Sequence, residues 1–90
     1  MEKTMTDATL LSEPKNYAIV QLPQRRFPGV VFQGDSLNIL INDIKAAVAE
    51  PVESERQLLL MDVIEHLETV QKGYEKVLAE NGIMLPYSNA

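Results

Sequence analysis

Short segments rich in hydrophobic residues lie in the first third of the chain, and hydrophobic residues recur at helical spacing in the rest. Within residues 16–33, the stretches Tyr17–Leu22 and Val30–Gln33 are rich in β-branched and aromatic side chains, which is typical of strands. We expect them to pair antiparallel, with a type II turn at Pro28–Gly29 in which the glycine takes a positive φ. Ala8–Leu11 is a further candidate, as a short edge strand. The pattern therefore predicts a small antiparallel sheet of two to three strands.

The apolar spacing becomes helical after Gly34. Residues 36–50 are predicted to form a helix, because their apolar side chains recur three and four positions apart and share one face. We expect Asp35 or Ser36 to cap its first turn. Pro51 should end it, since a proline disfavours the α conformation in the residue before it. The shared face consists of Leu37, Leu40, Ile41, Ile44 and Val48.

A longer amphipathic helix is predicted over residues 52–80. Ser54–Gln57 has the sequence form of a capping box at its start, and Asn81–Gly82 is a typical helix stop. Its apolar positions form a seam, which we define as Leu60, Val63, Leu67, Val70, Tyr74 and Val77, widened by Ile64 and Leu78. Such a seam packs either against the rest of the chain or against the same helix of a second copy, and both interpretations stay open.

The order of the predicted elements indicates the fold class. Strands come first and helices follow, which favours an α+β fold over a parallel α/β sheet. We expect one domain over residues 1–90, with a poorly ordered segment over residues 1–14 and an apolar tail over residues 83–87 that folds back onto the core. The predicted architecture is a short antiparallel sheet packed on two helices, of which the second is long and amphipathic.

The charge distribution restricts the partners. The chain has 90 residues and a net charge of −5. Residues 50–80 hold eight acidic side chains against three basic ones, whereas residues 1–34 are slightly basic. An acidic helix repels phosphate backbones, so direct nucleic-acid binding is not expected. The same field attracts a basic protein partner.

No segment has the features of a signal peptide or of a membrane anchor. Apolar runs do not exceed four residues, as at Leu58–Met61, whereas about 20 are needed to span a bilayer. The chain has no cysteine, so it can form neither a disulfide nor a thiolate metal site. We therefore expect a cytoplasmic protein that does not bind membranes.

Candidate catalytic and metal-ligating residues are few. His66 is the single histidine, and one imidazole beside helical carboxylates such as Asp62 and Glu65 makes a weak metal site. We interpret His66 as a surface residue next to the seam. No nucleophile, base and orienting group recur at the spacing of a catalytic site. The sequence therefore predicts no enzyme, no metal and no cofactor.

Three segments together resemble the HicB-like antitoxin domain, namely Tyr17–Val20, Pro28–Leu37 and Ala46–Ala47, with a looser likeness over Asn81–Pro86. Arg25–Leu37 is also similar to a signature of a group of small bacterial proteins, Arg-x-Phe-Pro-Gly-Val-Val-x-Gln-Gly-Asp-Ser-Leu. The resemblance to the antitoxin domain implies a partial ribonuclease-H-like fold without catalytic carboxylates, which binds a toxin and blocks it.

Together these features predict a small acidic inhibitor that neutralises a cognate toxin or effector by covering its basic surface, as antitoxins and immunity proteins do. The expected contact residues are Arg25, Arg26, Asp62, Glu65 and Glu68. One alternative is a homodimeric structural or adaptor protein that uses the seam of the long helix. Another is a binder of small anions, since the guanidinium forks of Arg25 and Arg26 suit carboxylates and phosphates.

Overall fold

The computed structural model describes residues 7–13 and 15–88. In chain order it contains strands β1 (Thr9–Leu10), β2 (Tyr17–Gln21) and β3 (Gly29–Phe32), then helices α1 (Gly34–Ala49) and α2 (Glu53–Glu80). The predicted α+β class is confirmed, with a three-stranded antiparallel sheet and a long second helix. The expectation of poor order over residues 1–14 falls in part on residues 1–6 and 14, which lie outside the described residues.

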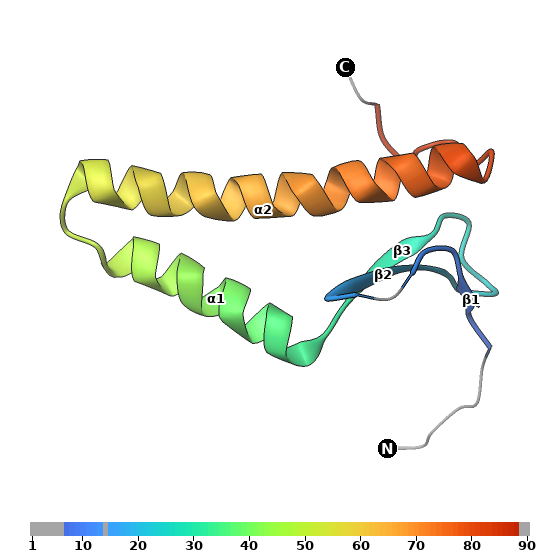
Figure 1. The fold of residues 1–90 in the computed structure, drawn as a ribbon, viewed down its shortest axis with the longest axis horizontal. Coiled ribbons are helices and arrows are strands. Elements are labelled where there is room, and N and C mark those ends of the chain that lie inside the picture. Colours follow the sequence, from blue (N-terminus) through green and yellow to red (C-terminus); the bar gives the residue numbers. More distant parts are fainter. Residues whose placement is uncertain (1–6, 14, 89–90) are drawn as a thin grey trace.

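The long helix α2 joins two different parts of the molecule (Figure 1). α1 starts beside the sheet and runs to the turn at residues 50–52, along the N-terminal half of α2. α2 then runs back, and the sheet covers its C-terminal half. We call α1 together with residues 53–69 of α2 the hairpin end. The sheet together with residues 70–88 is the sheet end.

The sheet has the order β1-β2-β3, with antiparallel neighbours. Ile19 of β2 lies opposite Val30 of β3, and Tyr17 lies opposite Phe32. Residues directly opposite each other project to the same side of a sheet. Since Ile19 belongs to the core formed with α2, all four side chains lie on the side that meets the helix. The other side carries Leu10, Ala18, Val20 and Val31.

The hydrophobic core lies at the sheet end. Ile19 of β2 and Leu78 of α2 are fully buried there, and Tyr74 of α2 packs with them. The apolar tail folds back as predicted, because Ile83 and Leu85 pack against this core. The partly buried residues around the core are Leu11, Tyr17, Val77, Ile83 and Leu85.

The C-terminal end of α2 is also as predicted. Gly82 has φ of 68°, a left-handed conformation that glycine adopts without a steric penalty. The N–H of Ile83 donates to the Leu78 carbonyl at 2.9 Å, and the N–H of Gly82 donates to the Ala79 carbonyl at 3.2 Å. These are the two hydrogen bonds of a Schellman motif, and they direct the tail back toward the core.

The prediction for the connection between β2 and β3 is wrong in one respect. Gly29 is the first residue of β3 and pairs with Val20. Among the described residues, Gly82 is the glycine with a positive φ, so Pro28–Gly29 does not form the expected type II turn. The strand extends one residue further back than the sequence indicated, because ladder pairing with β2 holds Gly29 in an extended conformation.

Both predicted N-terminal caps are also wrong. α1 begins at Gly34 after Gln33, α2 begins at Glu53 after Val52, and neither start has a side-chain capping bond. Asp35, Ser36 and the segment Ser54–Gln57 are therefore already inside their helices. The Asp35 carboxylate instead accepts the neighbouring N–H of Ser36 at 2.9 Å. The end of α1 at Ala49, ahead of Pro51, agrees with the prediction.

Candidate partner-binding surfaces

One buried hydrogen bond fixes the sheet on α2. The Tyr74 hydroxyl donates to the Pro28 carbonyl oxygen at 2.8 Å, and joins residues 46 positions apart. Both residues are buried. Burial raises the pKa of the Tyr74 phenol, because loss of water disfavours the phenolate. This bond holds the connection between β2 and β3 against the helix.

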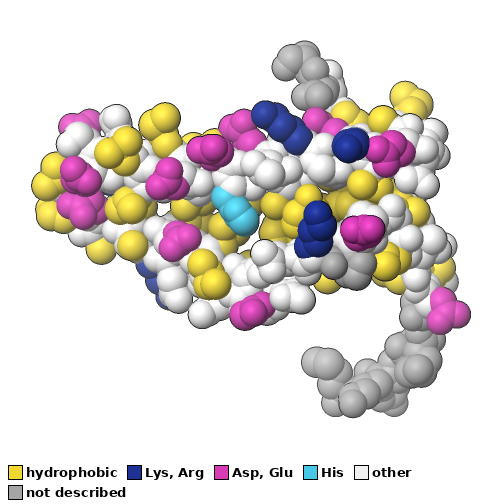
Figure 2. All heavy atoms as spheres, in the orientation of Figure 1, with side chains coloured by type: hydrophobic (Ala, Val, Ile, Leu, Met, Phe, Trp, Pro, Cys, Tyr) yellow, Lys and Arg dark blue, Asp and Glu magenta, His cyan; other side chains and the backbone are white. Residues whose placement is uncertain are grey.

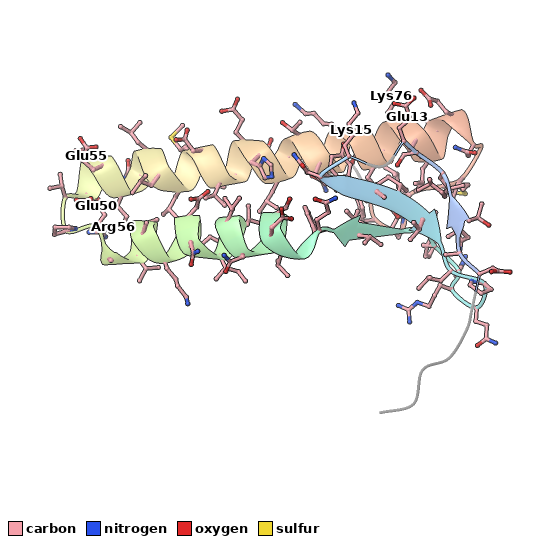
Figure 3. All side chains as sticks on the ribbon, turned by 60° about the horizontal axis from the view of Figure 1, so that its bottom comes forward. Glu13, Lys15, Glu50, Glu55, Arg56 and Lys76 are labelled. Carbon is pink, nitrogen blue, oxygen red and sulfur yellow. The ribbon has the colours of Figure 1, made fainter. Side chains whose placement is uncertain are left out.

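The turn between α1 and α2 is fastened by Glu50. Its carboxylate accepts the Val52 N–H at 3.1 Å, and its backbone carbonyl accepts the Arg56 Nε–H, also at 3.1 Å. Figure 3 shows Glu50 and Arg56 together at this turn. The two helices are thus tied at their connection, and they diverge from it toward the sheet (Figure 1).

A groove of about 500 Å³ lies between the two helices and the start of β2. We call it groove 1. Figure 2 shows this face of the molecule, with the single histidine in cyan between the helices. Its apolar lining includes Phe32, Ile39, Leu40, Leu59, Val63 and Val70, and its polar lining includes Lys15, Asp43, Asp62, His66 and Thr69. The groove thus combines apolar walls with charged groups of both signs.

His66 has acidic neighbours in groove 1. It is exposed and lines groove 1 together with Asp43 and Asp62. Within residues 7–13 and 15–88, however, no group of three or more histidine, cysteine or acidic side chains lies close enough to hold a metal ion. Its position beside Val63 and Val70 fits the interpretation of a surface residue next to the seam.

A second groove, of about 530 Å³, lies on the other side of α2, where the helix meets β3. We call it groove 2. The tail borders it through Tyr87, whose hydroxyl donates to a Glu75 carboxylate oxygen at 3.0 Å. Partial burial raises the pKa of the Tyr87 phenol. The lining is mostly apolar and includes Pro28, Val30, Ile64, Leu67, Val70 and Tyr74, with Glu68 and Gln71 as polar members.

The three acidic contact residues predicted on α2 do not share one face. Asp62 lines groove 1, and Glu68 lines groove 2. Since successive residues turn by about 100° around a helix, Glu65 lies midway between them, on the outer ridge away from the core. All three are exposed. A partner that contacts all of them has to cover this ridge.

The two predicted arginines lie at the sheet end, on the connection between β2 and β3. Both are exposed, and the Arg26 guanidinium lies 5.1 Å from the centre of the Phe27 ring, at cation–π distance. The Arg25 carbonyl accepts a hydrogen bond from the Gln21 side chain at 2.6 Å. Neither arginine lines groove 1 or groove 2, so these grooves do not join them to the acidic residues of α2.

Sequence reasoning missed how unevenly the charge is spread along α2. Residues 53–68 carry five acidic side chains against one basic side chain, Arg56. Residues 69–80 are balanced, with Glu75 and Glu80 against Lys72 and Lys76. An exposed salt bridge of 4.0 Å joins Lys76 to Glu80. The negative charge of the long helix is therefore concentrated at the hairpin end, where Figure 2 shows acidic side chains along its surface.

Sequence reasoning also missed that most of the apolar face of α1 is exposed. The buried residue of this helix is Ala47, and Leu40 is half-buried. The rest of the predicted face lies about a quarter turn further around the helix and is 39% to 76% exposed: Leu37, Ile41, Ile44 and Val48. The alanines Ala46–Ala47 could have indicated which side of α1 meets α2, because small side chains let two helices approach closely.

No helix within the described residues is both long enough and apolar enough to cross a membrane. No curated protein and no solved structure matches the chain. A family model matches residues 2–87. Because this match extends over nearly the whole chain, the protein belongs to that family, which is described as a family of unknown function, DUF6959.

Proposed function

We propose that this protein is a small inhibitor of the antitoxin or immunity-protein kind, which acts by covering a basic surface of a protein partner with its hairpin end. The observation that supports this proposal is the concentration of negative charge on residues 53–68 of α2, in the part of the molecule that projects away from the sheet (Figure 1). We further propose a cytoplasmic setting, with which a chain without cysteine is compatible.

The acidic ridge would act mainly on the rate of encounter. Asp62, Glu65 and Glu68 are exposed, and exposed ion pairs contribute only about 0–1 kcal/mol each. Their combined field, however, attracts a basic surface and orients it before contact. Charge therefore supports the choice of partner, and the affinity has to come from apolar contacts.

Groove 1 is an apolar surface that borders this ridge on one side, as groove 2 does on the other. It shares Asp62 with the ridge, and its walls include Leu59 and Val63. A long basic side chain of the partner fits such a site, because its methylene groups contact the apolar walls while its charge reaches a carboxylate. In this arrangement the hairpin end blocks its partner by occupying the surface around an active site, without any chemistry of its own.

The test is to capture partners on the purified full chain, identify them, and measure binding of each purified partner. The variant carries Asp62→Lys, Glu65→Lys and Glu68→Lys, and the control carries Glu75→Lys and Glu80→Lys at the sheet end. We expect a basic partner whose affinity falls at least tenfold with the first variant and less than threefold with the control. A partner that binds both variants equally, or the absence of any basic partner, would contradict the proposal.

The alternative of a small-anion site at Arg25 and Arg26 has less support. Neither side chain lines one of the two grooves, and Arg26 is stacked on Phe27. A site for a small ligand usually buries most of the ligand's surface in a concave pocket.

A further inference from the structure

We propose that a second copy of this chain covers an apolar surface of the hairpin end, which we call the hairpin face. This surface is made of four residues of α1 and three of α2: Leu37, Ile41, Ile44, Val48, Leu60, Ile64 and Leu67. Each of these side chains is between 38% and 76% exposed in the single chain. Contiguous apolar surfaces of this kind mark interfaces, since monomers seldom expose an apolar patch larger than about 300–600 Å².

Helix geometry places the seven residues on one side of the molecule. On α1, Ile39, Asp43 and Ala46 face groove 1. The stripe from Leu37 to Val48 lies on the flank of α1 that faces away from groove 1. On α2, the side toward groove 1 carries Asp62 and His66. The α2 members of the hairpin face again lie on the opposite side, where Ile64 and Leu67 also line groove 2.

The spacing within the hairpin face is that of a helix bundle. The α1 residues follow one another at intervals of four, three and four, and the α2 residues at intervals of four and three. Alternation of three and four is the pattern by which helices pack side by side in bundles. The two antiparallel helices thus form one layer of a bundle, whose second layer is missing within the described residues.

The neutrality of this surface identifies a second copy as its occupant. None of its seven side chains is charged, and the α2 stripe continues at both ends into uncharged glutamines, Gln57 and Gln71. A chain with a net charge of −5 repels itself unless the contacting surfaces are free of charge. A two-fold axis brings the same surface of each copy together, and a neutral, apolar layer is complementary to itself.

A second copy can bury much of the hairpin face. Its seven side chains are each between 38% and 76% exposed, so a large part of their apolar surface is still in contact with water in the single chain. A standard interface buries roughly 800 Å² on each partner. Stacking two hairpin layers face to face would remove an area of this size from water and give a four-helix bundle. Groove 1 and the ridge residues Asp62 and Glu65 stay outside this interface, whereas Glu68 borders it, since it lines groove 2 together with Ile64 and Leu67. The inference does not depend on the proposed function.

The test is the mass of the full chain in solution, measured by sedimentation equilibrium between 1 and 100 µM, with one substitution on each helix of the hairpin face, Ile41→Glu and Ile64→Glu. The controls place the same charge at exposed apolar positions on the other side of each helix, Ile39→Glu and Leu58→Glu. These two residues are 61% and 58% exposed, against 42% for Ile41 and 52% for Ile64. We expect a dimer for the wild-type chain and for both controls. For the two interface variants, the dissociation constant should rise at least 100-fold.

A third variant separates loss of the interface from loss of the fold. Val48 is 76% exposed, so Val48→Glu cannot disturb the core of the single chain, and we expect it to weaken the dimer at least tenfold. The helical circular dichroism of this variant should equal that of the wild-type chain, which would show that its fold is intact. A monomeric wild-type chain at 100 µM, an assembly larger than a dimer, or equal dissociation of the control and interface variants would overturn the proposal.

Discussion

The sheet end and the hairpin end use the same helix in different ways. At the sheet end, Val70, Tyr74 and Leu78 of α2 are buried. At the hairpin end, Leu60, Ile64 and Leu67 continue the same apolar spacing, yet they remain between 38% and 52% exposed. The comparison teaches that apolar periodicity identifies the side of a helix that prefers to leave water, but not what covers it.

The difference follows from the lengths of the elements. α2 has 28 residues and is therefore roughly 42 Å long at 1.5 Å per residue. The central strand β2 has five residues and spans about 17 Å, so the sheet covers less than half of the helix. α1 lies along the remainder but covers only one side of it. One side of this half of the helix therefore has no covering layer within the described residues.

The largest effect is expected in the core of the sheet end. Leu78→Ala removes a fully buried side chain and leaves a cavity, so the free energy of unfolding should fall by ~3 kcal/mol. At the hairpin end, Met61 is 63% exposed and lies outside the hairpin face, so Met61→Ala should cost less than about 0.5 kcal/mol. Urea unfolding at one fixed protein concentration measures both values. Equal losses of unfolding free energy would show that the two ends do not differ in how tightly they are packed.

The hydrogen bond between the helix and the sheet gives the next effect. Tyr74→Phe leaves the buried Pro28 carbonyl without its donor and should cost about 1–2 kcal/mol. Because burial raises the pKa of Tyr74 above its ordinary value of about 10, the unfolded chain loses this proton first as the pH rises. The stabilisation is therefore complete below pH ~10 and is lost above it.

The pH dependence of the variant checks this assignment. Between pH 9 and 11 the unfolding free energy of the wild-type chain should fall more steeply than that of Tyr74→Phe. Some slope should remain in the variant, because the pKa of Tyr87 is raised as well. Identical slopes in the two proteins would contradict the role given to Tyr74.

A contact between α2 and β2 gives a smaller effect, which a double-mutant cycle can isolate. A Cβ atom built on Gly73 would overlap the Tyr17 hydroxyl oxygen, so Gly73→Ala should fail to deliver the ~1 kcal/mol that alanine normally contributes over glycine inside a helix. In a Tyr17→Phe background this contact is absent, and the full gain should appear. The coupling free energy between the two sites should be about 1 kcal/mol. No coupling in thermal unfolding would mean that the ring does not lie against Gly73.

The smallest effect is expected at the hairpin turn. Arg56→Ala removes the hydrogen bond from the guanidinium to the Glu50 carbonyl and should cost about 0.5 kcal/mol, because this partly exposed carbonyl can bind water instead. Arg56→Lys is the control, because it keeps the positive charge but lacks the guanidinium Nε–H that reaches the Glu50 carbonyl. It should lower the stability as much as Arg56→Ala does. A loss above 1.5 kcal/mol in chemical denaturation would indicate that the hairpin end is more tightly organised than its exposure suggests.

Much of the fold follows from the sequence, since strand and helix patterns and the glycine stop at Gly82 are local signals. The predicted caps were wrong, because Asp35 and Ser54 are residue types that often cap helices, whereas the position of a helix start also depends on the preceding chain. The exposure of Leu37 and Ile64 was not predictable from spacing, because it depends on how far the sheet reaches along α2. The grooves were not predictable either, because each is lined by residues from elements that are distant in the sequence.

The central claim is that α1 and the first half of α2 lack a covering layer in the single chain and gain it from a second copy. Amide hydrogen exchange of the full chain, measured at 1 µM and at 200 µM, tests this claim most directly. The account predicts that protection of residues 37–48 and 58–67 increases strongly with concentration, whereas protection of residues 72–78 changes little. Equal protection of all three segments at both concentrations would contradict it.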